Sequence, residues 1–217
     1  MTTTASEWNE RYSASGRVWS GQPNGLLVQE VEGLSPGAAL DVGAGEGADA
    51  VWLASHGWQV TAVDISSVAI ARARSAGEDA GVDVTWLVSD IADVSGQFDL
   101  VSAFYPSVPK GTDMFQHICN LVAPGGTLLF VHHVPPSRVP DGQGGHGHHS
   151  HGGPHGHGQH KGPDFNKFMS VADARAALGD GWDVVKDDVI ARHLSCGAGA
   201  HHRLDGILRA VRLEPTA

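Results

Sequence analysis

Short apolar runs alternate with segments of helical periodicity along most of this chain. Ala38–Val42 is an apolar run that ends at glycines, and Ala48–Ser55 after it sets Val51, Trp52 and Leu53 among alanines, as a helix would. The alternation continues in predicted strands at Gln59–Val63, Val84–Val88, Phe98–Phe104, Thr127–Val131, Val184–Ala191 and Leu204–Leu213, and in predicted helices at Val68–Gly81, Asp113–Val122 and Val171–Leu178. Strands that alternate with helices pair in parallel through right-handed crossovers, so the pattern favours a parallel sheet.

The last two predicted strands depart from this arrangement because only a loop joins them, so we expect them to pair antiparallel. Two short helices, Glu7–Tyr12 and Leu26–Val31, precede the first strand and are expected to cover the core. The sequence therefore predicts an α/β fold: a Rossmann-like, doubly wound and mostly parallel seven-stranded sheet with an antiparallel last strand.

One segment has a composition that does not suit a packed core. Residues 135–163 are polar and rich in glycine and histidine, and no second core is predicted beyond them. We therefore expect a single domain over residues 1–217, in which residues 135–163 form a disordered insertion.

Charge and hydropathy narrow the range of partners. Fourteen Lys and Arg against 24 Asp and Glu give a formal net charge of −10, which repels phosphate backbones and anionic lipid surfaces. Met1–Asn9 lacks a basic region followed by an apolar stretch, and no apolar run approaches the roughly 18 to 20 residues that span a bilayer. We expect a cytoplasmic protein whose partners include neither nucleic acid nor membrane.

Glycines and acidic residues follow the first three predicted strands. Open parallel sheets bind ligands beyond the carboxyl ends of their strands, and there the first strand runs into Gly43, Ala44 and Gly45. Glycines permit a tight turn and close approach of a ligand, although they can also serve helix packing alone. Asp41, Asp64 and Asp90 end or follow three successive strands, so the fold brings three carboxylates to one edge of the sheet.

The charge of this edge discriminates between two classes of ligand. The glycine pattern also satisfies a loose dinucleotide fingerprint, as found in NAD(P)-dependent oxidoreductases. A pyrophosphate, however, favours bare amides, whereas Asp41 and Glu46 place carboxylates beside the loop. S-adenosylmethionine has no phosphate and carries a sulfonium and an ammonium group, so the acidic surroundings favour it.

These motifs resemble the class I S-adenosylmethionine-dependent methyltransferases, closely over residues 7–133 and more loosely over 170–213. The resemblance implies that Asp41 and the glycine loop hold the methionine portion, Asp64 binds the ribose and Asp90 meets the adenine amino group. The cofactor contacts implied are Tyr12, Trp19, Asp41, Gly43, Ala44, Gly45, Asp64, Ile65, Asp90, Ile91 and Phe104.

The N-terminal aromatics are similar to those of the thiopurine and tellurite-resistance branch of that superfamily. Trp8 and Tyr12 stand four positions apart and Trp19 follows. In that branch early aromatics close over the cofactor, so residues 1–35 are interpreted as a cofactor lid. The alternative is that these rings pack the first helix onto the domain.

The acceptor is expected to be a small molecule bound beyond the fourth and fifth strands. Tyr105 follows the fourth strand, His132 and His133 end the fifth, and all three are weak candidates for a catalytic role. A thiol, a reduced metalloid or another soft nucleophile needs no base, whereas a hydroxyl acceptor must lose its proton. Phe104-Tyr105-Pro106 also lacks the leading Asn or Asp of the Asn-Pro-Pro-Tyr motif of nucleobase amine methyltransferases, which again disfavours DNA.

The insertion carries a further candidate site, for Ni, Zn or Cu. Imidazole is a good ligand for these ions. The candidate ligands are His146, His148, His149, His151, His155, His157 and His160. A metal-binding or carrier protein on a methyltransferase scaffold is therefore an alternative to the enzyme.

Overall fold

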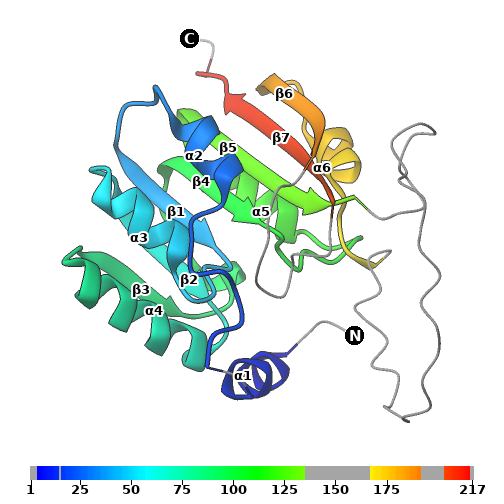
Figure 1. The fold of residues 1–217 in the computed structure, drawn as a ribbon. Coiled ribbons are helices and arrows are strands. Elements are labelled where there is room, and N and C mark those ends of the chain that lie inside the picture. Colours follow the sequence, from blue (N-terminus) through cyan, green and yellow to red (C-terminus); the bar gives the residue numbers. More distant parts are fainter. Residues whose placement is uncertain (1–3, 15, 135–166, 192–202, 216–217) are drawn as a thin grey trace.

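The computed structural model describes residues 4–14, 16–134, 167–191 and 203–215, and its centre is one seven-stranded sheet (Figure 1). The strands lie in the order β3-β2-β1-β4-β5-β7-β6. Their bounds are β1 Ala38–Val42, β2 Gln59–Asp64, β3 Val84–Val88, β4 Phe98–Phe104, β5 Val122–His133, β6 Trp182–Ala191 and β7 Leu204–Arg212. Strands β1 to β5 pair in parallel, and β7 runs antiparallel to both β5 and β6. This topology confirms the predicted fold class.

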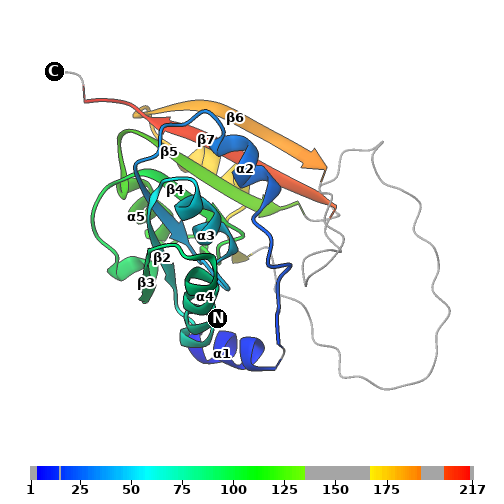
Figure 2. The same cartoon turned by 60° about the vertical axis from the view of Figure 1, so that its left-hand side comes forward.

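Helices cover both faces of the sheet (Figures 1 and 2). Their bounds are α1 Ala5–Ser13, α2 Gly25–Val31, α3 Ala48–Ser55, α4 Ser67–Ala80, α5 Met114–Asn120 and α6 Val171–Ala177, and a 3-10 turn, η1, lies at Ile91–Asp93. Helices α2 and α3 share a core with Ala39 and Leu100 on one face, whereas α5 and α6 pack with Leu40 and Val101 on the other. Neighbouring strand residues thus face opposite layers, as a pleated strand requires.

Local residue chemistry accounts for the element boundaries. Ser66 caps the start of α4 by accepting from the amide of Ala69, and Gly81 ends that helix at a φ of 67°, a left-handed conformation that favours glycine. Strand β5 begins at Val122 rather than at the predicted Thr127, because residues 122–126 join the sheet across a register irregularity beside β4.

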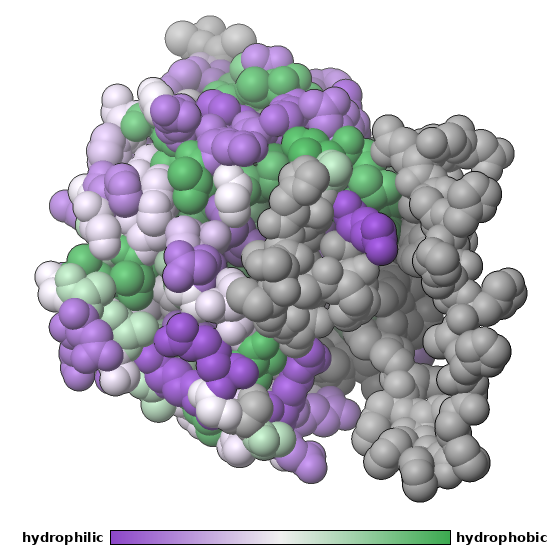
Figure 3. Space-filling view, viewed as in Figure 1, coloured by the Kyte–Doolittle hydropathy of each residue, from purple (hydrophilic) through white to green (hydrophobic). Residues whose placement is uncertain are grey.

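The topology fixes where a ligand can bind. Strand order reverses between β1 and β4, and the carboxyl ends of β1, β2 and β4 meet there beside the N-terminus of α3. The chain before β1 crosses this edge: α1 packs on α4, and α2 packs against the sheet. In Figure 3, hydrophilic residues cover much of the lower surface, over α1 and α4.

Two sequence predictions fall on residues outside the described ranges. The candidate metal ligands, which run from His146 to His160, lie there, as does the whole of the predicted insertion, residues 135–163. Within the described residues, no cluster of three or more His, Cys, Asp or Glu is arranged to hold a metal ion. None of the helices in the described ranges is long and apolar enough to cross a bilayer.

Candidate functional site

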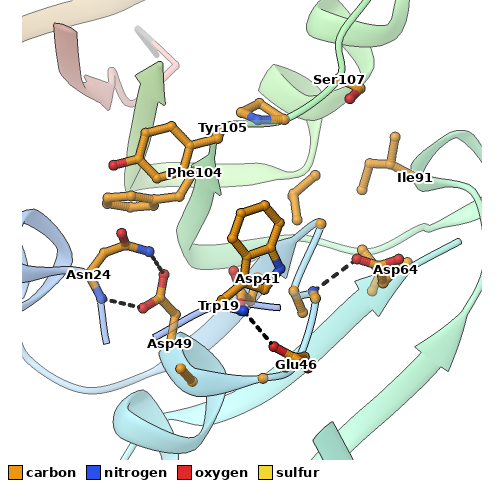
Figure 4. Close-up of a pocket in the computed structure, with 18 of the residues that line it drawn as sticks. Trp19, Asn24, Asp41, Glu46, Asp49, Asp64, Ile91, Phe104, Tyr105 and Ser107 are labelled. Carbon is orange, nitrogen blue, oxygen red and sulfur yellow. Dashed lines mark hydrogen bonds between the residues drawn. The ribbon is translucent and has the colours of Figure 1, made fainter. Parts of the chain in front are cut away.

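A cavity of about 860 Å³ lies at the carboxyl ends of the parallel strands, beneath the N-terminal segment (Figure 4). It brings together every cofactor contact that the family resemblance implied: Tyr12, Trp19, Asp41, Gly43, Ala44, Gly45, Asp64, Ile65, Asp90, Ile91 and Phe104. Tyr105 and His133 also line it. His132, the neighbour of His133 in β5, is not part of its lining and is buried.

Two buried carboxyl groups form the floor of the cavity. The Oδ1 atom of Asp41 lies 3.3 Å from the Ser102 hydroxyl, whereas its buried Oδ2 atom has no hydrogen-bond partner among the described residues. Asp49, in the first turn of α3, accepts from the backbone amide and the side-chain amide of Asn24, each at 2.7 Å. Burial raises the pKa of Asp41 well above its usual value, and the Asp49 charge raises it further.

The glycine loop and Asp64 hold each other in place. The amide of Gly45 donates to Asp64 Oδ2 at 2.9 Å, and the amide of Ser66 donates to Oδ1 at 2.8 Å. Burial raises the pKa of Asp64, while these two amide bonds oppose the shift. Because Gly45 has a φ of 54°, its amide can turn toward the second strand without the strain that a Cβ would add.

The far end of the cavity, over β2 and β3, combines apolar side chains with one exposed acid. Ile91 is buried and Ile65 is half-buried, and both line the cavity after the strand ends. Asp90 is exposed, and its Oδ1 atom caps η1 by accepting from the amide of Ala92 at 3.0 Å. An apolar slot with an acidic rim is suited to a planar base that carries an amino group.

Aromatic residues of the N-terminal segment lie directly on the glycine loop. The indole Nε1 of Trp19 donates to the hydroxyl of Tyr12 at 2.9 Å. A Cβ added to Gly45 would stand 2.9 Å from that hydroxyl and 3.3 Å from the indole nitrogen. Tyr12 is only 2% exposed, and burial raises the pKa of its phenol. These rings therefore both pack the first helix and form one wall of the cavity.

Glu46 lines the cavity beside the glycine loop, as the sequence predicted, and its carboxylate is also engaged by the protein. It accepts from the amides of Val18 and Trp19 at 3.1 and 2.9 Å. Arg72 of α4 pairs with it at 2.8 Å and also donates to the carbonyl of Tyr12 at 2.6 Å. Glu46 and Arg72 thus fasten the N-terminal segment to the loop and to α4.

The end of the cavity beside β5 and β7 contains an acid that the sequence reasoning missed. Asp205 is 2% exposed, its Oδ1 atom lies 2.8 Å from His133 Nδ1, and its Oδ2 atom accepts from the Tyr105 hydroxyl at 2.7 Å. The Tyr105 and His133 rings stack at 4.1 Å. The pair of Asn24 with Asp49 was missed in the same way, since only the fold brings α2 and α3 together.

The fold and the site define a Rossmann-like domain with a cavity at the carboxyl ends of its parallel strands, and comparison with known proteins finds a family that matches part of the chain. Residues 39–126, from β1 into β5, match the model of a family described as a methyltransferase domain. This match confirms the resemblance to the S-adenosylmethionine-dependent methyltransferases seen in the motifs, and it covers less than half of the chain.

Curated relatives match over part of their length. The chain is 32% identical over 127 residues to the ribosomal RNA small subunit methyltransferase C of Alcanivorax borkumensis, covering 54% of this chain and 38% of the relative. It is 33% identical over 112 residues to the ubiquinone biosynthesis O-methyltransferase of Pectobacterium atrosepticum, covering 49% of this chain and 46% of the relative. The chain thus spans less than half the length of these two relatives.

Solved structures share the whole fold at low sequence identity. The N-methyltransferase NodS from Bradyrhizobium japonicum, solved with S-adenosyl-L-homocysteine, has a TM-score of 0.70 at 17% identity, covering 98% of this chain and all of NodS. TehB from Haemophilus influenzae has a TM-score of 0.59 at 15% identity, covering 97% of this chain and 67% of TehB. These similarities support the fold.

Proposed function

We propose that this protein binds S-adenosylmethionine in the 860 Å³ cavity and transfers its methyl group to a small molecule. The observation that carries the proposal is the buried Oδ2 atom of Asp41, which has no hydrogen-bond partner among the described residues. An unsatisfied buried polar atom costs free energy, so a cationic ligand group is the natural complement to it. The ammonium and sulfonium groups of S-adenosylmethionine supply such charge, and a pyrophosphate does not.

The residues at the other strand ends fit the rest of the cofactor. Asp64 retains acceptor capacity on both oxygens for ribose hydroxyls, even though each oxygen already receives one amide. Ile65 and Ile91 provide apolar faces for the adenine ring, and Asp90 provides an acceptor for its amino group. When bound, the sulfonium supplies an activated methyl group, and the chain's contribution is to align the acceptor with it and exclude water.

A small acceptor is favoured over RNA. One matched relative is named for ribosomal RNA and another for an O-methylation in ubiquinone biosynthesis, so the names alone do not choose between acceptor classes. The net charge of −10 opposes binding of a phosphate backbone. The acceptor end of the cavity is also narrowed by the N-terminal segment and by β6, both of which contribute to its lining.

Ligand-dependent thermal stability tests the proposal. We expect S-adenosylmethionine and S-adenosylhomocysteine to raise Tm, because ligands that bind the folded state stabilise it, and NAD⁺ to leave Tm unchanged.

Asp64→Ala should weaken cofactor binding roughly tenfold to a hundredfold, since it removes a charge-assisted hydrogen bond. Asp83→Ala, which alters an exposed acid outside the cavity, is the matched control. A shift by NAD⁺ alone would favour the dinucleotide alternative.

The histidine-rich segment supports a second, independent activity. Seven histidines between His146 and His160 are set among glycines, a composition suited to Ni²⁺, Zn²⁺ or Cu²⁺. We propose micromolar or tighter binding that weakens below about pH 6 as imidazoles protonate. Deleting residues 142–160 should abolish metal binding and leave cofactor affinity nearly unchanged. Full metal affinity in the deletion variant would place the ligands elsewhere.

A further inference from the structure

An acid and an imidazole from two strands meet a phenol from the turn after a third strand at one end of the cavity. In the antiparallel register of β5 and β7, Asp205 is the direct partner of His133, and Tyr105 follows the end of β4. The Asp205 carboxylate is engaged at both oxygens, by the imidazole Nδ1 at 2.8 Å and by the phenol hydroxyl at 2.7 Å. The side chains of Asp205 and His133 are only 3% and 13% exposed.

This arrangement fixes the state of the imidazole. An ionised carboxylate only accepts hydrogen bonds, so the proton of a neutral His133 must reside on Nδ1. The basic lone pair is then on Nε2, the other ring nitrogen. The Tyr105 ring stacks on the imidazole at 4.1 Å with an interplanar angle of 24°, which restricts its rotation. His133 is therefore held as an oriented base.

Tyr105 is held in a strained conformation in order to make these contacts. Its φ of 55° is the one positive value among non-glycine residues of the described ranges. A bulky residue is rarely found in the left-handed region, and such strain is typical of functional sites. The amide of Tyr105 donates to the carbonyl of Val131 at 2.8 Å, which anchors the turn to β5.

The group lies at the end of the cavity where an acceptor would bind. Asp64 and Ile91 mark the ribose and adenine end over β2 and β3, and the sheet order places β5 and β7 on the other side of β1 and β4. Figure 4 shows Tyr105 on the side of Asn24 and Asp49, away from Asp64 and Ile91. Leu26, Pro106 and Ile190 add apolar lining at this end.

We propose that His133 is the general base of the methyl transfer, that Asp205 and Tyr105 are its positioning residues, and that the acceptor is a weakly acidic hydroxyl. The inference rests on the proposed function and deepens it. A phenol or enol on a largely apolar small molecule fits the lining. A thiolate or reduced metalloid has its lone pair available at neutral pH and gains nothing from a held base, whereas a phenol must lose its proton.

The proposed methyl transfer is a single displacement at the methyl carbon. As the acceptor O–H bond breaks, its proton passes to His133 Nε2, and the oxygen forms a bond to the methyl carbon. The carbon–sulfur bond of the sulfonium breaks in the same displacement, and its electron pair remains on sulfur as a neutral thioether. The imidazolium that results is stabilised by Asp205 and later releases its proton to solvent.

Acceptor acidity provides the test, with methyl-labelled S-adenosylmethionine and four probes: 4-methylphenol, 4-nitrophenol, thiophenol and tellurite. We expect wild-type protein to label the phenols. His133→Gln should lower kcat for 4-methylphenol by about 100-fold or more, and for 4-nitrophenol, which is largely ionised at pH 8, by much less. Asp205→Asn should likewise lower the rate more for 4-methylphenol than for 4-nitrophenol. A merely structural role of Asp205 would lower both rates equally. His56→Gln, at an exposed histidine outside the cavity, is the matched control.

Cofactor binding distinguishes a failure of the general-base proposal from a failure of the proposed function. Cofactor binding is measured by calorimetry for each variant, and it should stay within about twofold of wild type. Label on thiophenol or tellurite alone, or on none of the probes while the cofactor binds, would overturn the assignment of a hydroxyl acceptor. Equal losses on both phenols in His133→Gln would overturn the general base. If that variant fails to fold, Asp205→Asn and the wild-type acceptor preference decide. Absence of cofactor binding by wild type would overturn the proposed function itself.

Discussion

At the scale of single residues, the site is built at the expense of the stability of the free protein. Asp41, Asp49 and Asp64 are all carboxyl groups whose pKa burial raises. A raised folded-state pKa favours the protonated form, so the stabilising contribution is full at low pH and is lost as pH rises through the folded-state pKa. A cationic ligand reverses this balance, because it favours the ionised carboxylates.

Asp41→Asn should make the thermal stability of the free protein less dependent on pH. In wild type we expect Tm to fall between about pH 4 and pH 8 in part because Asp41 must ionise in a buried place. Asparagine does not titrate, so the decline should be shallower, though not absent, since Asp49 and Asp64 remain. Thermal denaturation across this pH range measures the slope. Asp83→Asn, at an exposed acid, should leave the slope unchanged; an unchanged slope in Asp41→Asn would contradict the account.

Gly45→Ala should weaken cofactor binding by more than backbone strain alone explains. Its positive φ costs an alanine about 1–2 kcal/mol, and the new Cβ would also press on Tyr12 and Trp19. Gly81→Ala introduces comparable strain, at a φ of 67°, where the added Cβ meets nothing within 4 Å. Both variants should lose thermal stability, and only Gly45→Ala should lose affinity in a titration with S-adenosylmethionine. Equal affinities in the two variants would show that Tyr12 and Trp19 do not shape the cofactor site beside Gly45.

At the scale of elements, the N-terminal segment depends on two side chains of the domain. Arg72→Met should release the tie from α4 to Glu46 and to the carbonyl of Tyr12, and we expect a several-fold to tenfold loss of cofactor affinity with the sheet intact. Arg74→Met is the matched control, because this neighbour is exposed and its guanidinium donates to the carbonyl of Trp86. Fluorescence titration of the cofactor with both variants measures the difference. Unaltered affinity in Arg72→Met would mean that the segment does not shape the site.

The order and type of the elements could be predicted because burial on both faces leaves a readable pattern of short apolar strands between helices. Asp41, Asp64 and Asp90 could be found because each lies near the carboxyl end of its own strand or just after it, so the chain order alone brings them to one edge. Asp205 could not, since it meets His133 only through the antiparallel register of β5 and β7, across 72 positions. The pairing of Glu46 with Arg72 could not be predicted for a related reason: Arg72 is supplied by another helix.

At the scale of the whole molecule, a net charge of −10 and a cluster of buried acids at the strand ends select for a cationic ligand. In the proposed function the sheet order gives the cavity an adenine end, a central acidic floor and an acceptor end, and residues of the N-terminal segment contribute to its lining. The central claim is that S-adenosylmethionine occupies this cavity with its cationic portion against Asp41.

The most direct test is a calorimetric titration of S-adenosylmethionine between pH 5 and pH 8, carried out in buffers of different ionisation enthalpy. Because Asp41 has a raised pKa and must be ionised to hold a cation, we expect micromolar affinity that increases with pH, together with release of protons on binding. In Asp41→Asn the affinity should fall at least tenfold and the proton release should diminish. Binding of equal strength in both proteins, or no binding to wild type at any pH, would contradict the account.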